Sequence, residues 1–125
     1  MNSKPPPSKY ASGLQGQQAA ETFLHKKGLT VLARNYRTRT GEIDLIARYR
    51  TYIIFIEVKA RSSTSHGRPA EAVGYHKQQK IIQTARHYLN RYGLTDSDVR
   101  FDVVEVLTTV GKTEINHIED AFWAN

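Results

Sequence analysis

Cysteine is absent from this chain of 125 residues. That absence excludes a disulfide framework, zinc fingers held by thiolates and catalysis by a thiol nucleophile, and it suits the reducing cytoplasm. Long apolar runs are also missing, because the longest, residues 53–56, is far shorter than the about 20 residues of a membrane-spanning helix. We therefore expect a cytoplasmic protein with no membrane partner.

The N-terminal residues lack the apolar stretch that a signal peptide needs. They are polar and contain the run Pro5-Pro6-Pro7, so we interpret residues 1–12 as a flexible leader. Residues 13–125 are long enough to bury one hydrophobic core, and no linker or internal repeat divides them. The sequence predicts a leader followed by a single domain.

Acidic residues are scarce before residue 101. The chain carries a net charge of +6, and its last 25 residues hold one lysine against five acids, so the first hundred residues carry +10. Basic and aromatic residues also alternate in residues 34–39 and 48–52, a pattern that suits phosphate contacts and stacking on bases. The charge pattern favours nucleic acid over a membrane surface as the partner.

Two acidic residues interrupt apolar segments that we expect to form adjacent strands. Asp44 lies in the segment 42–46, and Glu57 lies with Lys59 in the segment 53–59. Because successive strand residues point to opposite faces, Glu57 and Lys59 share one face, while the alternate apolar residues share the other.

A hairpin turn at residues 50–51 would set the register of these strands. With the two flanking tyrosines paired, Asp44 lies directly across from Glu57. Opposed like charges are destabilising unless something neutralises them, and a divalent cation would do so. The turn lacks the Asn-Gly or Gly-X residues that favour a two-residue hairpin, so this register is a hypothesis.

The residue types in these strands suit Mg²⁺ or Mn²⁺. Mg²⁺ is usually held by one or two carboxylates, waters and substrate phosphate, and Asp44 and Glu57 would supply the carboxylates. The carbonyl of Val58 is a candidate third ligand, and Lys59 can orient the attacking water or stabilise developing charge. The alternative is that Asp44 is an edge-strand charge and that Glu57 and Lys59 form a solvated ion pair.

The motif Gly-Glu-Ile-Asp-Leu-Ile-Ala of residues 41–47, followed by Phe-Ile-Glu-Val-Lys-Ala-Arg of residues 55–61, resembles the bacterial YraN family. The resemblance covers about residues 13–107. Members of that family look like small PD-(D/E)XK nucleases, similar in plan to archaeal Holliday-junction resolvases. The resemblance implies an α/β, restriction-endonuclease-like fold and metal-dependent cleavage of nucleic acid.

Individual residues match the superfamily motif. Asp44, Glu57 and Lys59 match its D…ExK core, and Glu21 matches the extra acid that many members carry on the first helix. Ile43 stands where the superfamily name calls for proline. On its own, Glu21 would be read as surface charge at the border of the apolar stripe of its helix.

Further polar residues are candidates for contacts with nucleic acid. Arg61 continues the strand parity of Lys59, and Lys77, Gln79 and Lys80 begin the second helix, whose positive dipole end can bind phosphate. The alternative for these helix residues is a solvated face. Asp102 is expected to be a charge at the entry of a strand, outside the core site.

The predicted element order is αβββαββ, a mixed central sheet flanked by helices. A polar loop at residues 62–67 follows the motif strands and could close over substrate, and Pro69 suits the start of a helix. The other predicted elements are a helix from Ser12-Gly13 to Gly28, a strand at 29–37, a helix from about 75 to 93, and strands at 101–107 and 113–118.

These observations predict hydrolysis of nucleic-acid phosphodiesters, with DNA the favoured substrate and Mg²⁺ or Mn²⁺ as cofactor. The alternatives are a nucleic-acid-binding module of the same fold that does not cleave, and a scaffold that acts through protein contacts. A homodimer is a further expectation, because similar junction resolvases must cut two opposed strands.

Overall fold

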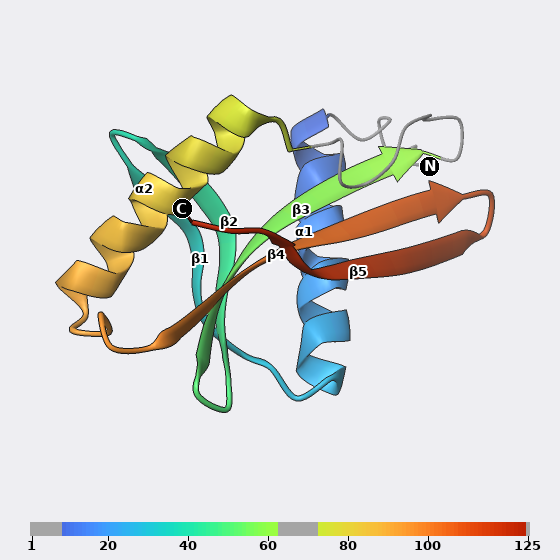
Figure 1. The fold of residues 1–125 in the computed structure, drawn as a ribbon. Coiled ribbons are helices and arrows are strands. Elements are labelled where there is room, and N and C mark those ends of the chain that lie inside the picture. Colours follow the sequence, from blue (N-terminus) through green and yellow to red (C-terminus); the bar gives the residue numbers. More distant parts are fainter. Residues whose placement is uncertain (1–8, 63–72, 125) are drawn as a thin grey trace.

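The computed structural model describes residues 9–62 and 73–124 (Figure 1). The start of the predicted leader, most of the polar loop and Pro69 lie outside the described residues. Within them, no helix is long and apolar enough to cross a membrane.

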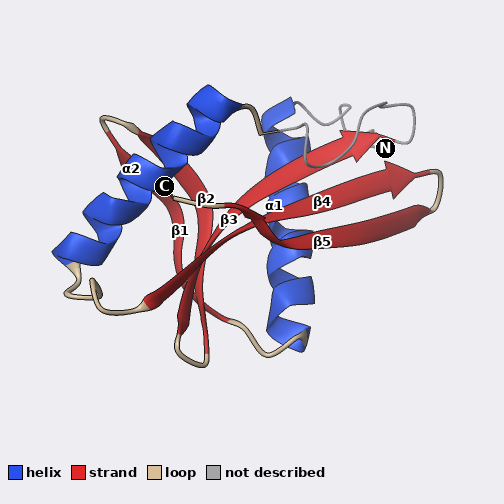
Figure 2. Ribbon diagram, viewed as in Figure 1, coloured by secondary structure: helices blue, strands red, loops and turns tan. Residues whose placement is uncertain are grey.

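Two helices and five strands follow one another in the predicted order αβββαββ (Figure 2). They are α1 (Lys9–Lys26), β1 (Thr30–Thr38), β2 (Gly41–Tyr49), β3 (Tyr52–Ser62), α2 (Tyr75–Arg91), β4 (Asp98–Thr109) and β5 (Lys112–Phe122).

The five strands form one mixed sheet in the order β1-β2-β3-β4-β5. Strands β1, β2 and β3 are joined as antiparallel neighbours, and β4 and β5 form an antiparallel hairpin. Strand β4 pairs with β3 in parallel, which requires a crossover connection, and α2 lies within that connection. The predicted restriction-endonuclease-like arrangement, a mixed sheet flanked by helices, is confirmed.

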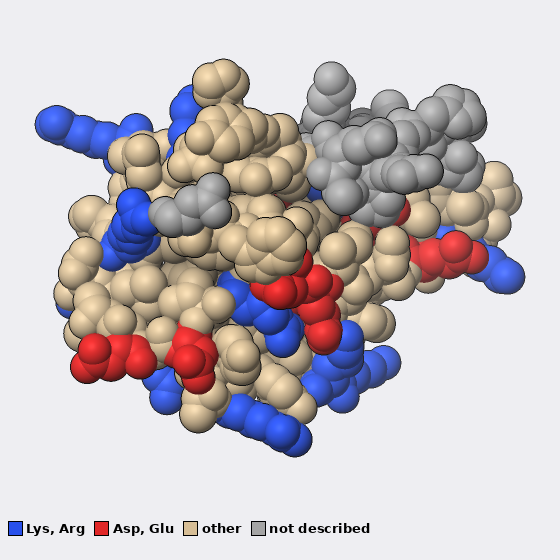
Figure 3. All heavy atoms as spheres, in the orientation of Figure 1, with Lys and Arg blue, Asp and Glu red and all other residues tan. Residues whose placement is uncertain are grey.

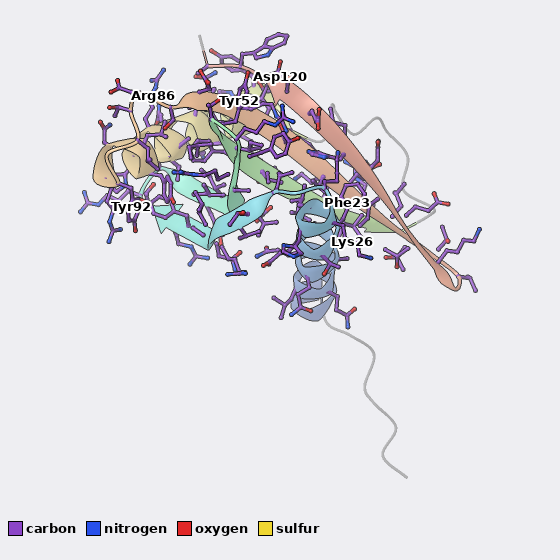
Figure 4. All side chains as sticks on the ribbon, turned by 90° about the horizontal axis from the view of Figure 1, so that it is seen from below. Phe23, Lys26, Tyr52, Arg86, Tyr92 and Asp120 are labelled. Atoms are coloured by element: carbon purple, nitrogen blue, oxygen red, sulfur yellow. The ribbon has the colours of Figure 1, made fainter. Side chains whose placement is uncertain are left out.

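Each helix covers one face of the sheet. Helix α2 packs Ile82 against a core that contains Phe55 and Phe101, whereas α1 packs Leu24 against a core that contains Ile54. Figure 4 shows the two helices on either side of the strands. Phe55 and Ile54 therefore point to opposite faces, as the period of two along β3 predicts.

The register of the β2–β3 hairpin is the predicted one. Tyr49 pairs with Tyr52, and the same register continues to Leu45 and Ile56. The turn has Arg50 at φ 55°, a left-handed conformation that costs a residue with a Cβ about 1–2 kcal/mol. The guanidinium of Arg50 lies 5.2 Å from the centre of the Tyr49 ring. The apolar pattern of the strands therefore sets this register despite unfavourable turn residues.

Several elements extend beyond their predicted bounds, and β5 runs to Phe122 where the prediction ended at residue 118. Helix α1 begins at Lys9, not at Ser12-Gly13, because Lys9 to Ser12 include no residue that stops a helix. Residues 9–12 of the predicted leader are thus helical. Strand β4 begins at Asp98 and runs to Thr109, longer at both ends than the predicted residues 101–107.

The longer β4 places Asp102 inside the strand, so the predicted position at the strand entry is wrong, while Asp102 does lie outside the cluster of motif residues. Asp102 is fully buried inside the strand and accepts two hydrogen bonds of 2.9 Å from the guanidinium of Arg100. His117 Nε2 lies 2.7 Å from its Oδ2, and the backbone N–H of Asp120 donates to its Oδ1. Burial would raise the pKa of Asp102, but the hydrogen bonds from His117 and Arg100 outweigh it and lower the pKa. Asp102 is a buried structural anion that ties β5 to β4.

Helix α1 lies close against β3 at Gly16. A Cβ at this position would lie 2.8 Å from the Cβ of Ala60, so only glycine fits without a shift. Ala60 follows Lys59, and the close approach therefore sets the N-terminal turns of α1 beside the end of β3 that carries the sequence motif. Gly13, one turn earlier, has no atom of the described residues within 4 Å of an added Cβ.

We expect Gly16→Ala and Gly13→Ala to change stability in opposite directions. Gly16→Ala should lower the free energy of unfolding by about 1–3 kcal/mol because the new methyl group overpacks the contact with Ala60. Gly13→Ala, the matched control on the same helix, should raise it by about 0.5–1 kcal/mol because alanine loses less backbone entropy. Urea unfolding of both variants measures the difference, and equal stabilisation by the two would contradict the close contact.

Candidate active site

The motif residues lie together where the β2–β3 pairing ends. The last regular pair is Leu45 with Ile56, and Asp44 and Glu57 are the next residues on each strand. Lys59 follows on β3. The structure thus brings the two acids and the lysine of the motif to one place, beside the first turn of α2.

Asp44 is held by the backbone of the neighbouring strand. Its Oδ2 accepts a hydrogen bond of 2.8 Å from the backbone N–H of Val58. A side chain thereby satisfies a strand N–H beyond the regular ladder, which fixes the Asp44 carboxyl toward β3. The Val58 carbonyl, predicted as a metal ligand, belongs to the same residue, and its role stays a prediction.

Glu57 is buried and surrounded by positive charge. Its side chain is only 8% exposed, and its Oε1 lies 2.6 Å from Lys77 Nζ and 3.6 Å from Lys59 Nζ. A buried carboxylate without partners would be costly, so these two ammoniums stabilise its charge. Lys77, predicted as a phosphate contact, is thus part of the same charge cluster as the motif residues.

The pKa of Asp44 is raised from its ordinary value of 3.8 to about 7. Burial of the carboxyl contributes most, and repulsion from Glu57 comes next; the N–H of Val58 and the charge of Lys77 act in the opposite direction. Asp44 therefore exchanges its proton near neutral pH. The predicted like-charge stress between Asp44 and Glu57 is present in the structure.

The two lysines of the cluster are perturbed in opposite directions. Burial lowers the pKa of Lys59, and the neighbouring Lys77 ammonium lowers it further against the attraction of Glu57. Burial also acts to lower the pKa of Lys77, but the hydrogen bond to Glu57 outweighs it and the pKa is raised. Lys59 is therefore the more readily deprotonated ammonium.

Two hollows meet at Asp44 and Glu42. One, of about 690 Å³, lies between the start of α1 and the strands, and the other, of about 520 Å³, lies beneath the first turns of α2. The first is lined by Gly13, Leu14, Gln17, Asn35, Arg37, Glu42, Asp44, Val58, Lys59 and Ala60. The second is lined by Gly41, Glu42, Asp44, Glu57, His76, Lys77, Lys80 and Ile81.

Four further polar side chains that line these hollows were not predicted from the sequence to be site residues. They are Gln17, Asn35, Arg37 and His76. Asn35 has φ 51° inside a strand, a conformation with no local sequence signal other than the tolerance of asparagine for it. The alternation of arginine and aromatic residues in 34–39 pointed to Arg37 as part of a basic segment, but not to its place beside Asp44.

The structure does not bring Glu21 into this cluster. Glu21 forms a two-pronged ion pair with Arg34, with Arg34 Nε 2.8 Å from Glu21 Oε2, and lines a separate hollow over β1. Gln17, one helical turn earlier, lines the hollow with Asp44, together with Gly13 and Leu14 of the same helix. The predicted role of Glu21 at the metal stays a prediction.

The other residues predicted to contact nucleic acid do not all line the two hollows. Lys80 lines the hollow beneath α2 together with Lys77, whereas Gln79 lines neither of the two hollows that meet at Asp44. Arg61 is directed to the buried Glu105, with Arg61 Nε 3.7 Å from Glu105 Oε2. On the face of the molecule that Figure 3 shows, lysine and arginine side chains are dispersed, with acidic side chains between them.

The number of carboxylates in the cluster bears on which metal ion it could hold. Within residues 9–62 and 73–124, no three His, Asp or Glu side chains gather as a metal-binding group. Mg²⁺ commonly takes only one or two carboxylates and fills its shell with water and substrate oxygens. Asp44 and Glu57 are the residues that could hold an ion of that kind.

The raised pKa of Asp44 predicts a stability that falls as the pH rises. The folded-state pKa lies above that of the unfolded chain, so the stability that Asp44 contributes is present below about pH 4 and is lost as the pH rises through about 7. We expect Asp44→Asn to raise the free energy of unfolding by roughly 2 kcal/mol at pH 8 and by less than half as much at pH 5, because asparagine carries no charge at either pH.

Urea unfolding at the two pH values, with EDTA present, measures this difference. Glu42→Gln is the matched control, since Glu42 lines the same hollows but is paired with the exposed Arg37. The same effect of Asp44→Asn at pH 5 and pH 8 would contradict a charge conflict at Asp44.

Comparison with known proteins places this chain among a set of bacterial relatives. The pattern of the "Uncharacterised protein family UPF0102" matches residues 16–106. The chain is 49% identical to a UPF0102 protein of Alkaliphilus oremlandii over 88% of this chain and 96% of that protein. It is 42% identical to a UPF0102 protein of Caldanaerobacter subterraneus over 92% of this chain and 97% of that protein. The chain belongs to the UPF0102 (YraN) family.

Proposed function

We propose that this protein is a divalent-metal-dependent endonuclease that hydrolyses phosphodiester bonds of nucleic acid, with DNA the favoured substrate. The observation that carries the proposal is the cluster of Asp44, Glu57 and Lys59 at the meeting point of two hollows. The resemblance of these residues to the D…ExK motif supports the same reaction.

Asp44 and Glu57 would hold the metal, with the Val58 carbonyl as a further ligand. When bound, Mg²⁺ or Mn²⁺ supplies a polarised phosphate and a bound water of lowered pKa. The hydrogen bond from the Val58 N–H holds the Asp44 carboxyl toward β3 before any ligand arrives. Because the pKa of Asp44 is about 7, its carboxyl is ready to give up its proton to solvent when a cation favours the charged form.

Lys59 would orient the attacking water and stabilise negative charge on the phosphate. Its Nζ lies 3.6 Å from Glu57, and burial lowers its pKa, so its ammonium donates hydrogen bonds in a poorly solvated place. Lys77 and Lys80 at the start of α2, with Arg61 and Gln79, would bind phosphates on either side of the scissile one.

The structure of the DNA substrate is also part of the proposal. Branched or structured DNA is suggested by the resemblance to junction resolvases, and a homodimer would let two opposed strands be cut.

A catalytically inactive binding module of the same fold is the second candidate. It is favoured by the charge of the cluster itself, because Lys59 and Lys77 outweigh the two acids whenever Asp44 is protonated. A cluster of that charge attracts a phosphate backbone without any cleavage.

Cleavage of labelled DNA decides between the two candidates. The substrates are duplex, single-stranded, flapped and four-way-junction DNA, incubated with Mg²⁺, Mn²⁺ or EDTA. We expect cleavage only with a metal ion, and a loss of about a hundredfold or more in Asp44→Asn, Glu57→Gln and Lys59→Met. Glu114→Gln, an exposed acid on β5, is the control and should cut like the original protein.

The variants also separate the remaining alternatives. DNA binding that weakens with salt, but no cutting with either metal, would replace the nuclease proposal by the binding module. If the protein neither binds nor cuts, both nucleic-acid functions are wrong and the scaffold alternative remains. Glu21→Gln should lose activity only if Glu21 serves the metal, since its ion pair with Arg34 lies in another hollow.

A further inference from the structure

Glu57 is shared by two lysines that are held to different degrees. Both ammoniums approach the same oxygen, Oε1, with Lys77 Nζ at 2.6 Å and Lys59 Nζ at 3.6 Å. Lys59 belongs to the same strand as Glu57, and its side chain is 23% exposed, whereas the side chain of Lys77 is 45% exposed. Lys77 therefore makes the closer contact although it has the greater freedom to leave.

The place of Lys77 in α2 is unfavourable for a cation. The helix follows the N-cap residue Gly74, Lys77 is its third residue, and no acidic residue lies in the first turn. The N-terminal end of a helix carries a partial positive charge that disfavours an ammonium and favours an anion. Lys77 is thus held at this end by the carboxylate of Glu57 and not by the helix.

A divalent cation on Glu57 would compete with this contact. An ammonium 2.6 Å from Oε1 occupies the space and the lone pairs that a metal ion needs, and two cations at such close range repel each other. Once displaced, the Lys77 ammonium would lie near the positive end of α2 without its carboxylate partner. A phosphate at the same helix end is the anion that would take the place of Glu57.

Building on the proposed function, we propose that Lys77 is a mobile counter-ion that couples the binding of metal to the binding of nucleic acid. It forms an ion pair with Glu57 until a divalent cation displaces it, and it then binds a phosphate at the start of α2. Metal and nucleic acid each make the binding of the other more favourable through the same side chain. Lys77 is a positioning residue in this scheme, distinct from Lys59.

Lys80 provides a matched control for Lys77. It lies three residues further along the same helix and lines the same hollow, and it is exposed. Lys80 has no ion pair with any residue in the described part of the chain, unlike Lys77. Lys77→Met and Lys80→Met therefore remove the same charge from the same hollow, and only the first removes a contact with Glu57.

Isothermal titration of the full chain with Mn²⁺ tests the proposal. We expect Lys77→Met to bind Mn²⁺ roughly tenfold more tightly than the original protein, and Lys80→Met to differ from it by less than about threefold. A saturating concentration of a short single-stranded DNA, checked on a gel to be intact, should tighten Mn²⁺ binding by the original protein. The DNA should have little effect on Lys77→Met.

The outcomes distinguish this inference from the proposed function. Equal Mn²⁺ affinities of Lys77→Met and Lys80→Met would overturn the counter-ion role and leave the metal site intact. If no Mn²⁺ binding is lost in Glu57→Gln, the metal site itself is wrong and the Lys77 inference is overturned with it. Circular dichroism checks the fold, and Lys77→Gln replaces Lys77→Met in the comparison if the methionine variant unfolds.

Discussion

The constraint on which the site depends is the withdrawal of two carboxyl groups from water at the end of one hairpin, with Glu57 buried and Asp44 half-buried. Asp44 and Glu57 follow the last regular pair of β2 and β3, where apolar residues on both faces leave little solvent to screen their charges. The protein answers this stress in two ways. Asp44 accepts a hydrogen bond from a backbone N–H, and its raised pKa lets it be neutral. The charge of Glu57 is balanced by two lysines. Such an arrangement lowers stability, as is common at functional sites, and the proposed metal ion would relieve the repulsion between the two acids.

The helices determine which side chains reach this place. The close approach of Gly16 to Ala60 fixes α1 along β3, so that Gln17 lines the hollow beside Asp44. Helix α2 forms part of the crossover between two parallel strands, and its first turn therefore lies over the sheet near Glu57. The arrangement of the sheet and the helices thus brings α1, β2, β3 and α2 together around one pair of acids.

The sheet and the motif could be predicted from the sequence because their signals are local. The period of two in residues 53–59 gives the faces of β3, and the paired tyrosines give the register even with Arg50 in a strained turn. The role of Asp102 could not be predicted in the same way. Its burial depends on His117 and Arg100, which reach it only once β4 and β5 have paired, and no spacing in the sequence states that pairing.

The choice between Glu21 and Gln17 shows why the rest of the site needed three dimensions. Both lie on one face of α1, one turn apart, and only the close contact at Gly16 decides which turn lies beside Asp44. Glu21 is then within reach of Arg34 on β1. An amide at position 17 adds no negative charge beside Asp44 and Glu57. Two lysines can therefore balance the charge of the two acids. With both acids ionised the cluster is therefore close to neutral, and under the proposed function a bound cation would give it the positive charge that attracts phosphate.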